Sequence, residues 1–200
     1  MARATKAQRR AEKQRADEER RKRETSRRTI RVTAITIGAG LALVAMLVLL
    51  WPEPQEGDTS AEAWDLPQLD GDGRMALSDF RGTPTVAAFF ASWCDVCEQE
   101  IPEYLALSKQ VGDAVLFVGI DTQDNGRGLG DAEKRGIAGV WPLAEDIGNG
   151  NGSGLSTGSF GIRGSPMTVF YDENGAVLHV QRGGLSGEQL LSALNEFYGV

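Results

Sequence analysis

Two cysteines three residues apart are the side chains of this 200-residue chain with the clearest capacity for chemistry. Cys94 and Cys97 are its only cysteines, and both lie in the stretch FFASWCDVCEQEIPEYL. The apolar run TVAAFFAS before them predicts a buried strand, and Cys94 to Gln110 predicts a helix. The first cysteine therefore opens a helix, whose unpaired N–H groups stabilise a thiolate. Because a thiolate is the nucleophile of disulfide exchange, this setting favours a redox pair.

Within the pair, we expect Cys94 to be the exposed nucleophile and Cys97 the more buried resolving thiol, one helical turn further on. A structural zinc site would need four ligands, whereas the chain has one histidine, His179, in a predicted strand. A Cu(I) site stays open because thiolates bind Cu(I), but a third ligand is not evident. A purely structural disulfide is disfavoured because so short a loop gains little from closure. We therefore predict no metal or cofactor besides the Cys94–Cys97 disulfide.

The segments around the pair predict an α/β fold. Their order is a short hairpin, then β-α-β-α-β, then a second hairpin with Asn174 and Gly175 at its turn, then an amphipathic helix. This order gives a sheet with helices on both faces. The predicted elements after the first helix are the strand Ala114–Asp121, the helix Asp131–Arg135, the strand or extended segment Val140–Asp146, the hairpin Met167–Gly184 and the helix Leu185–Tyr198. The glycine-rich stretch Gly148–Gly161 is predicted to be a surface connection.

The charge of the chain is divided between its two ends. Residues 1–31 carry 13 Lys and Arg against 5 Asp and Glu, whereas the remainder carries 8 against 23. Clustered basic residues are needed to bind phosphates, so the acidic remainder excludes nucleic acid as the partner of the globular part. Acidic residues interrupt the basic segment and no aromatic residue lies among them, so we interpret it as a topology signal.

A membrane anchor accounts for this division. The 20 residues from Val32 to Trp51 carry no charge, which is enough for a helix to cross a core of about 30 Å. A cleaved signal peptide is the alternative, but its apolar region is usually shorter, and the AEA sequence at 61–63 lies well beyond the run. The positive-inside rule then predicts a single-pass protein of the cell membrane with a cytoplasmic N-terminus. The predicted segments are a basic cytoplasmic segment (1–29), the anchor (30–51), a linker (52–63) and an extracytoplasmic domain (64–200).

The cysteine motif resembles that of a known family. FFASWCDVCEQEIP is similar to the FWASWCxxCxxExP segment of thioredoxin-like proteins of the TlpA, ResA and DsbE type. The flanking segments LDGDGRMALSDFRGTPTVAAFF and FGIRGSPMTVFYDENGAVLHVQRGGLSGEQLLSAL also resemble this family, over about residues 64 to 200. The resemblance implies a thioredoxin-like fold, with a central mixed sheet flanked by helices and an N-terminal hairpin extension. A single transmembrane helix would precede it.

The resemblance also implies roles for residues around the disulfide. Trp93 would shape the surface beside the nucleophile, and Pro166 matches the cis-proline that lies against the disulfide in this fold. The cis bond would expose the backbone of Ser165 to pair with an extended substrate. Pro102 resembles the proline that kinks the active-site helix.

Glu100 is the acid singled out by this comparison. Thioredoxin itself has a buried aspartate six residues before its first cysteine, where this chain has Ala88. Glu100 matches instead the glutamate that ResA-like proteins carry near the disulfide. Our hypothesis is that it takes the proton of Cys97 during resolution. The alternative is an ordinary solvated carboxylate on a helix.

The two residues between the cysteines depart from the family pattern. Val96 replaces a common proline, and Asp95 adds a carboxylate whose charge opposes a thiolate at Cys94. We therefore expect a reducing disulfide, and a reductase of protein disulfides that serves cytochrome c maturation or thiol maintenance. Its expected partners are protein thiol or disulfide substrates and a membrane redox protein, and we expect a monomer. An oxidase, a Cu(I) metallochaperone and a non-catalytic binding module stay open, whereas a peroxidase is disfavoured because Ala91 occupies the position of its threonine.

Overall fold

The computed structural model describes Met46 and residues 60–147 and 154–200. Residues from 60 onward belong to one compact unit, Glu56–Val200. Within residues 60–147 and 154–200, the strands and α-helices are β1 (Asp65–Pro67), β2 (Arg74–Ala76), β3 (Thr85–Phe90), α2 (Asp95–Val111), β4 (Leu116–Asp121), α3 (Gly128–Arg135), β5 (Leu143–Glu145), β6 (Met167–Tyr171), β7 (Val177–Arg182) and α4 (Gly187–Tyr198). None of the helices described is long and apolar enough to cross a membrane. The predicted anchor at 30–51 lies outside the described residues except for Met46.

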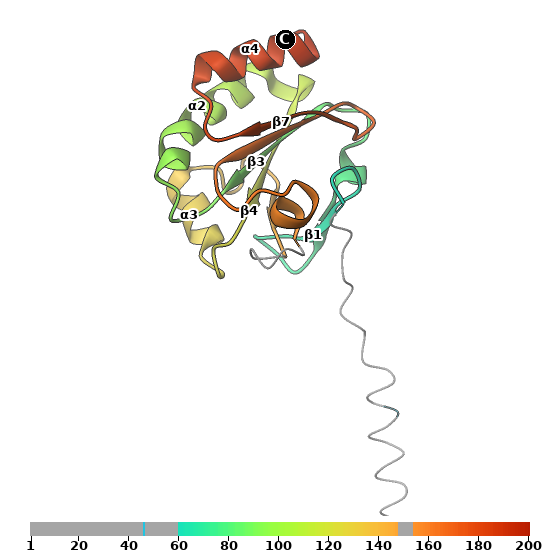
Figure 1. The fold of residues 1–200 in the computed structure, drawn as a ribbon, viewed down its shortest axis with the longest axis vertical. Coiled ribbons are helices and arrows are strands. Elements are labelled where there is room, and N and C mark those ends of the chain that lie inside the picture. Colours follow the sequence, from blue (N-terminus) through green and yellow to red (C-terminus); the bar gives the residue numbers. More distant parts are fainter. Residues whose placement is uncertain (1–45, 47–59, 148–153) are drawn as a thin grey trace, which may run out of the picture. The chain divides into compact units, whose positions relative to one another are not determined.

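Five of the described strands form one mixed sheet in the order β5-β4-β3-β6-β7 (Figure 1). β3 pairs in parallel with β4 and antiparallel with β6, so the strand that leads to the cysteines lies at the centre. Every residue of β3 is buried, as its continuous apolar sequence predicts for a strand covered on both faces. The final hairpin is confirmed, and Gly175 in its turn has a φ of 87°.

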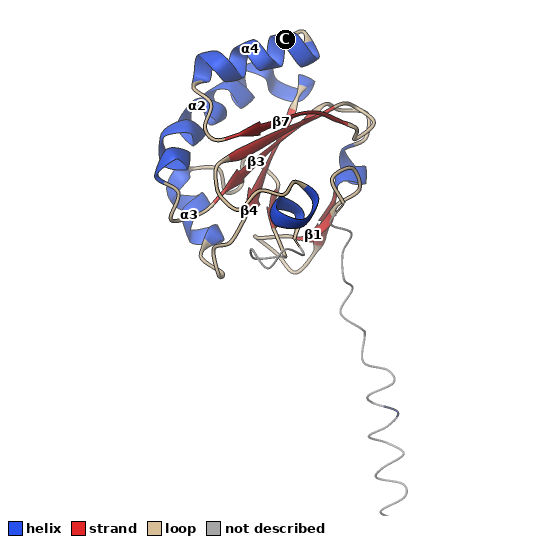
Figure 2. Ribbon diagram, in the orientation of Figure 1, coloured by secondary structure: helices blue, strands red, loops and turns tan. Residues whose placement is uncertain are grey.

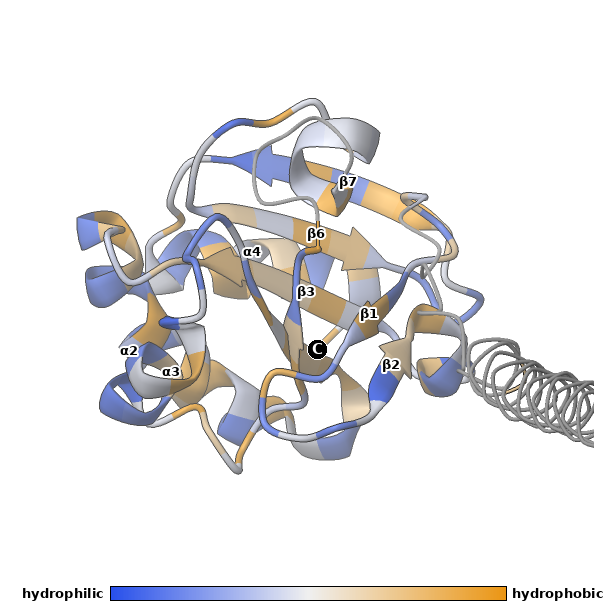
Figure 3. Cartoon of the chain, turned by 90° about the horizontal axis from the view of Figure 1, so that it is seen from below, coloured by the Kyte–Doolittle hydropathy of each residue, from blue (hydrophilic) through white to orange (hydrophobic). Residues whose placement is uncertain are grey.

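Helices α2, α3 and α4 all pack on one face of this sheet (Figure 2). Phe90, Phe117 and Phe170 of three strands contribute to this core, together with Tyr104 of α2 and Leu190 of α4. Figure 3 shows hydrophobic colouring along the central strands β3 and β6, whereas α2 and α3 carry both hydrophobic and hydrophilic residues. Such two-sided helices bury one face and expose the other.

The opposite face of the sheet is covered differently from our expectation. The β1–β2 hairpin contributes Leu66, and a single helical turn, Leu155–Ser159, contributes Leu155. Our prediction of helices on both faces is therefore wrong for the three long helices. The parallel strands β3, β4 and β5 are neighbours in chain order, and right-handed crossovers that continue in one direction keep both connecting helices on the same side.

Helix α2 begins directly after Cys94, close to the predicted start, and ends at Val111. Ile101 and Tyr104 are fully buried three residues apart and seat the helix on the sheet. Gly112 follows with a φ of 56°, a conformation that favours glycine and ends the helix. The helix thus holds the cysteine motif at the end of the central strand.

Candidate active site

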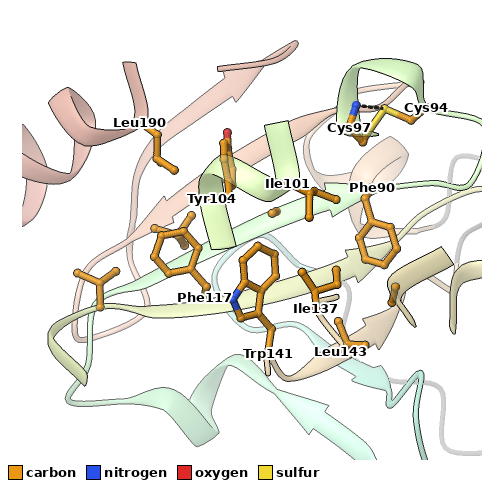
Figure 4. Packing of buried hydrophobic residues seen from close by; sticks show 14 of the residues in the cluster. Phe90, Cys94, Cys97, Ile101, Tyr104, Phe117, Ile137, Trp141, Leu143 and Leu190 are labelled. Atoms are coloured by element: carbon orange, nitrogen blue, oxygen red, sulfur yellow. Dashed lines mark hydrogen bonds between the residues drawn. A yellow bond between two sulfur atoms is a disulfide. The ribbon is translucent and has the colours of Figure 1, made fainter. Parts of the chain in front are cut away.

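The two cysteines form a disulfide at the N-terminus of α2, with their Cα atoms 5.3 Å apart. Cys94 is the N-cap residue, and its sulfur accepts a hydrogen bond of 3.1 Å from the backbone N–H of Cys97. Figure 4 shows the disulfide at the edge of the core, beyond Phe90 and Ile101. The sulfur of Cys94 therefore lies where helix N–H groups stabilise negative charge.

The exposure of the two cysteines differs from our expectation in degree. Cys97 is 0 % exposed and Cys94 is 4 % exposed. Cys97 is the more buried of the two, as predicted, but the prediction that Cys94 is an exposed residue is wrong. Its side chain is turned into the disulfide and belongs to the same core cluster as Ile101, so only an edge of it reaches solvent.

Two apolar side chains beside the disulfide are exposed. Trp93 and Val96 are each 48 % exposed, and the indole N–H of Trp93 donates a hydrogen bond of 3.1 Å to the carbonyl of Gln123. Exposed apolar groups next to a reactive centre form a surface on which a protein substrate can dock. Asp95 and Glu98 are also exposed on this first turn of the helix.

The loop that contains Pro166 lies at the same end of the sheet. The Ser165–Pro166 peptide bond is cis, as the resemblance implies. A Cβ atom added to Gly184 would lie 3.8 Å from Pro166, 3.1 Å from Glu100 and 2.6 Å from Val96. The loop that contains Pro166, the helix α2 and the connection between β7 and α4 therefore lie close together around Gly184.

Glu100 is a buried carboxyl group, 6 % exposed, which rules out the alternative of a solvated helix residue. Its Oε2 accepts a hydrogen bond of 3.1 Å from the backbone N–H of Leu185. Burial raises the pKa of Glu100 to about 7, although the Leu185 N–H and the charge of Arg135 act in the opposite direction. An open cavity of about 330 Å³ adjoins it, lined by Val96, Gly184 and Leu185 among others.

A second set of polar groups was not anticipated from the sequence. Asp124 accepts two hydrogen bonds from Ser92, one from its backbone N–H and one from its hydroxyl. Asp121 lies beside Asp124 and is 1 % exposed. Parallel pairing of β3 and β4 could have pointed to these groups, because the segments that follow two parallel neighbouring strands lie at the same edge of the sheet.

Metal ligands do not converge around the cysteines. Among residues 60–147 and 154–200, no group of three or more His, Cys, Asp or Glu side chains is arranged to hold a metal ion. His179 lies in β7, where its ring stacks on Phe197 at a centroid distance of 5.5 Å. The redox-active group of the site is the disulfide itself.

A family model described as a thioredoxin-like domain matches residues 74–198, and the chain belongs to this family. Its curated relatives in this family include proteins named as thiol:disulfide interchange proteins. It is 31 % identical over 117 residues to the thiol:disulfide interchange protein DsbE of Pseudomonas fluorescens biotype C, which covers 58 % of this chain and 60 % of that protein. The chain thus aligns with less than two thirds of this relative's length.

Two further proteins extend the comparison. The thiol:disulfide interchange protein DsbE of Pseudomonas aeruginosa is 27 % identical over 154 residues, which cover 70 % of this chain and 78 % of that protein. The structure of a secreted Mycobacterium tuberculosis disulfide oxidoreductase homologous to E. coli DsbE has a TM-score of 0.54 and is 22 % identical. The alignment covers 66 % of this chain and 95 % of the Mycobacterium tuberculosis chain. At 22 % identity, this similarity supports the fold alone.

Proposed function

We propose that the protein is an extracytoplasmic reductase of protein disulfides in which Cys94 attacks and Cys97 resolves. The observation that carries this assignment is the Cys94 sulfur at the N-cap of α2, with the Cys97 N–H donated to it. Donation to the sulfur and the helix terminus both favour the thiolate at Cys94. Cys97 is fully buried, so a substrate disulfide reaches Cys94 first.

The reaction balances as two exchanges. The Cys94 thiolate attacks one sulfur of the substrate disulfide, which forms a mixed disulfide and releases the other substrate sulfur as a thiolate. The Cys97 thiolate then attacks the Cys94 sulfur, restores the Cys94–Cys97 disulfide and releases the second substrate thiolate. The substrate gains two electrons and the enzyme loses two, so a membrane redox partner must supply a dithiol for the next cycle.

Glu100 is the group that takes the proton of Cys97 before the second exchange. Its pKa of about 7 lies near neutral pH, where a carboxylate is an effective acceptor and a carboxylic acid an effective donor. It lies three residues after Cys97, on the neighbouring part of the helix face, and it adjoins an open cavity.

The direction of the reaction follows from the charges around Cys94. The exposed carboxylates of Asp95 and Glu98 on the first turn oppose a thiolate, while the helix terminus favours it. A thiolate that is only weakly stabilised makes the dithiol a better electron donor. We place this domain outside the cytoplasm, behind a single-span anchor at 30–51, because the basic residues of 1–29 precede the uncharged run. Reduction of a disulfide to two free thiols before haem attachment to cytochrome c is the role that this arrangement suits.

The reduction potential of the Cys94–Cys97 couple tests the direction. We expect a value closer to about −270 mV, as in thioredoxin, than to about −120 mV, as in the oxidant DsbA. A value near that of DsbA would make the protein an oxidase. Glu100→Gln should slow resolution of a mixed disulfide and remove a transition near pH 7 from the exchange profile. Glu133→Gln is the control, because Glu133 is an exposed residue of α3.

A further inference from the structure

The turn that leads from β3 to Cys94 is held by the loop that follows β4. Asp124 Oδ2 accepts the backbone N–H of Ser92 at 2.9 Å, and Asp124 Oδ1 accepts the hydroxyl of the same residue. Ser92 stands two residues before Cys94, whose own N–H bonds to the carbonyl of Ala91 at 3.1 Å. One carboxylate thus fixes the backbone from which the nucleophile projects.

Two further contacts join the same segments. The N–H of Thr122 donates to the carbonyl of Phe90 at 2.9 Å, and the indole N–H of Trp93 donates to the carbonyl of Gln123. Gln123 and Asn125 have φ values of 59° and 52°, a conformation that non-glycine residues rarely adopt. Such backbone conformations persist where the surroundings impose them, and they cluster at functional sites.

Asp121 supplies the second carboxyl group of this arrangement. It ends β4, is 1 % exposed, and lies within hydrogen-bonding reach of Asp124. Among the described residues, its Oδ1 has no hydrogen-bond partner. Two buried carboxyl groups this close do not both ionise at neutral pH, because each negative charge disfavours the other. The proton that one of them retains can be donated to the other.

We propose that Asp121 and Asp124 share one proton and act as positioning residues of the disulfide. Asp121 donates the shared proton to Asp124, and the ionised Asp124 holds Ser92 and, through it, the turn that presents Cys94. The inference rests on the proposed function for its role in exchange, but the effect on Cys94 does not depend on any substrate. Because Asp124 accepts both hydrogen bonds from Ser92, it is the acceptor of the pair and Asp121 is the donor.

The charges around the pair agree with this arrangement. Burial, followed by the charge of Asp124, raises the pKa of Asp121 to about 8. Glu145 of β5 and Asp131 of α3 act in the same direction, and Asp131 is itself paired with Arg135 at 2.6 Å. Above about pH 8 the pair takes a second negative charge, and Asp121 no longer donates. The turn then loses part of its support, and the added charge also opposes a thiolate at Cys94.

The test is the rate at which iodoacetamide alkylates Cys94 in the reduced full-length protein between pH 5 and 10. This reagent is small and uncharged, so the rate reports the thiolate and its access without substrate docking. Asp121→Asn keeps an N–H donor toward Asp124 but cannot ionise. We expect wild type and Asp121→Asn to react within about twofold at pH 6.5 and wild type to be several-fold slower at pH 9.5, where a free thiol is ionised. The ratio of the two rates should change around pH 8.

Further variants separate positioning from charge. Asp121→Ala removes the donor and should react several-fold more slowly than Asp121→Asn at pH 6.5. Ser92→Ala keeps the backbone bond to Asp124 but removes the hydroxyl, so the transition should move to higher pH. Asp172→Asn is the control, because Asp172 also accepts backbone N–H groups, from Asn174 and Ala176, but in the turn between β6 and β7. Its profile should match that of wild type.

Two results would overturn the inference. One is a constant ratio between wild type and Asp121→Asn across the pH range, and the other is equal rates for Asp121→Ala and Asp121→Asn at pH 6.5. Failure of the proposed function is a different outcome, because it would appear as a wild-type protein that cannot reduce insulin disulfides. The alkylation profiles would still decide the role of the pair.

Discussion

Two buried carboxyl sites contact the active-site segment, and they retain protons near neutral pH for different reasons. Glu100 is a single carboxyl group on α2 whose pKa rises to about 7 because of burial, against the opposing effect of the Leu185 N–H. Asp121 has a pKa of about 8 because burial is reinforced by the neighbouring Asp124. Glu100 therefore changes between neutral and singly charged, whereas the aspartate pair changes between one charge and two.

This difference separates two uses of a buried proton. Glu100 adjoins an open cavity, so its proton can be exchanged with a reacting thiol or with water. Both oxygens of Asp124 accept hydrogen bonds from Ser92, and the residue is 1 % exposed. Asp124 therefore holds the turn before Cys94 and does not face the reacting groups. Burial raises the pKa of both Glu100 and Asp121. The groups that contact each carboxyl group determine whether its proton can be transferred during the reaction.

The largest expected effect is on the pH dependence of the free energy of unfolding. Between an ordinary pKa and a raised one, the folded state holds a proton that the unfolded chain has released, so stability is greatest at low pH and falls as pH rises. For Asp121 the fall extends from about pH 4 to 8, and for Glu100 from about pH 4.5 to 7. At about 1.36 kcal/mol per pH unit, the upper limits are on the order of 5 and 3 kcal/mol.

Urea denaturation at several pH values measures this difference. Asp121→Asn should flatten the curve more than Glu100→Gln, and it should stabilise the protein most at pH 8. Asp172→Asn should leave the slope between pH 4 and 8 unchanged, because backbone N–H groups lower the pKa of Asp172 and its contribution to stability is lost only on further acidification. Equal flattening by the Asp121 and Glu100 variants would remove the distinction between the two sites.

Next in size is the loss of stability in Asp124→Ala. The substitution leaves the N–H of Ser92 without its acceptor and Asp121 without its neighbour, which should lower the free energy of unfolding by about 2–4 kcal/mol. Glu100→Ala removes one acceptor from the Leu185 N–H and one costly buried group, so its loss should be smaller. Thermal and urea unfolding at pH 7 compare the two, and a larger loss for Glu100→Ala would contradict the assignment of Asp124 as the structural support.

The sequence could identify one of these sites more readily than the other. The position of Glu100 three residues after Cys97 could be read from the motif, but its burial depends on Leu185, which is 85 residues away. For the same reason the burial of Cys94 could not be read from its position at a helix start. Three-dimensional packing, rather than local pattern, determines both.

The aspartate pair is present in the sequence as DTQD, which begins at the last residue of a predicted strand. Its meaning depends on register, because Phe90 at the end of β3 pairs with Asp121 at the end of β4. That pairing brings Ser92 and Asp124, 32 residues apart, into contact. The strands and helices themselves followed from apolar runs and turn residues, whereas the placement of all three long helices on one face followed from strand order.

A smaller effect is expected from two glycines, each of which packs against one site. A Cβ atom at Gly128 would lie 2.2 Å from the carboxyl carbon of Asp121, so Gly128→Ala must displace a buried group at a cost of about 1–3 kcal/mol. A Cβ atom at Gly184 would lie 2.6 Å from Val96, whose exposed side chain can move, so Gly184→Ala should cost less.

Gly130→Ala is the matched control for these variants. It lies in the same helix as Gly128, and a Cβ atom there would meet nothing within 4 Å. Alanine is favoured over glycine inside a helix, so this variant should gain about 0.5–1 kcal/mol in urea denaturation. If Gly184→Ala proved more harmful than Gly128→Ala, the packing around Glu100 would be the less adaptable of the two.

The smallest expected effect is that of Trp93→Phe, which asks whether Asp124 or Trp93 holds the loop after β4. Phenylalanine keeps the aromatic surface but removes the hydrogen bond to the Gln123 carbonyl. Because Trp93 is 48 % exposed, water can replace that bond, and the free energy of unfolding should fall by about 0.5–1 kcal/mol. The ratio of alkylation rates between pH 6.5 and 9.5 should stay that of wild type, since the aspartate pair is intact. A loss as large as that of Asp124→Ala would instead make the indole, rather than the carboxylate, the group that fixes the turn before Cys94.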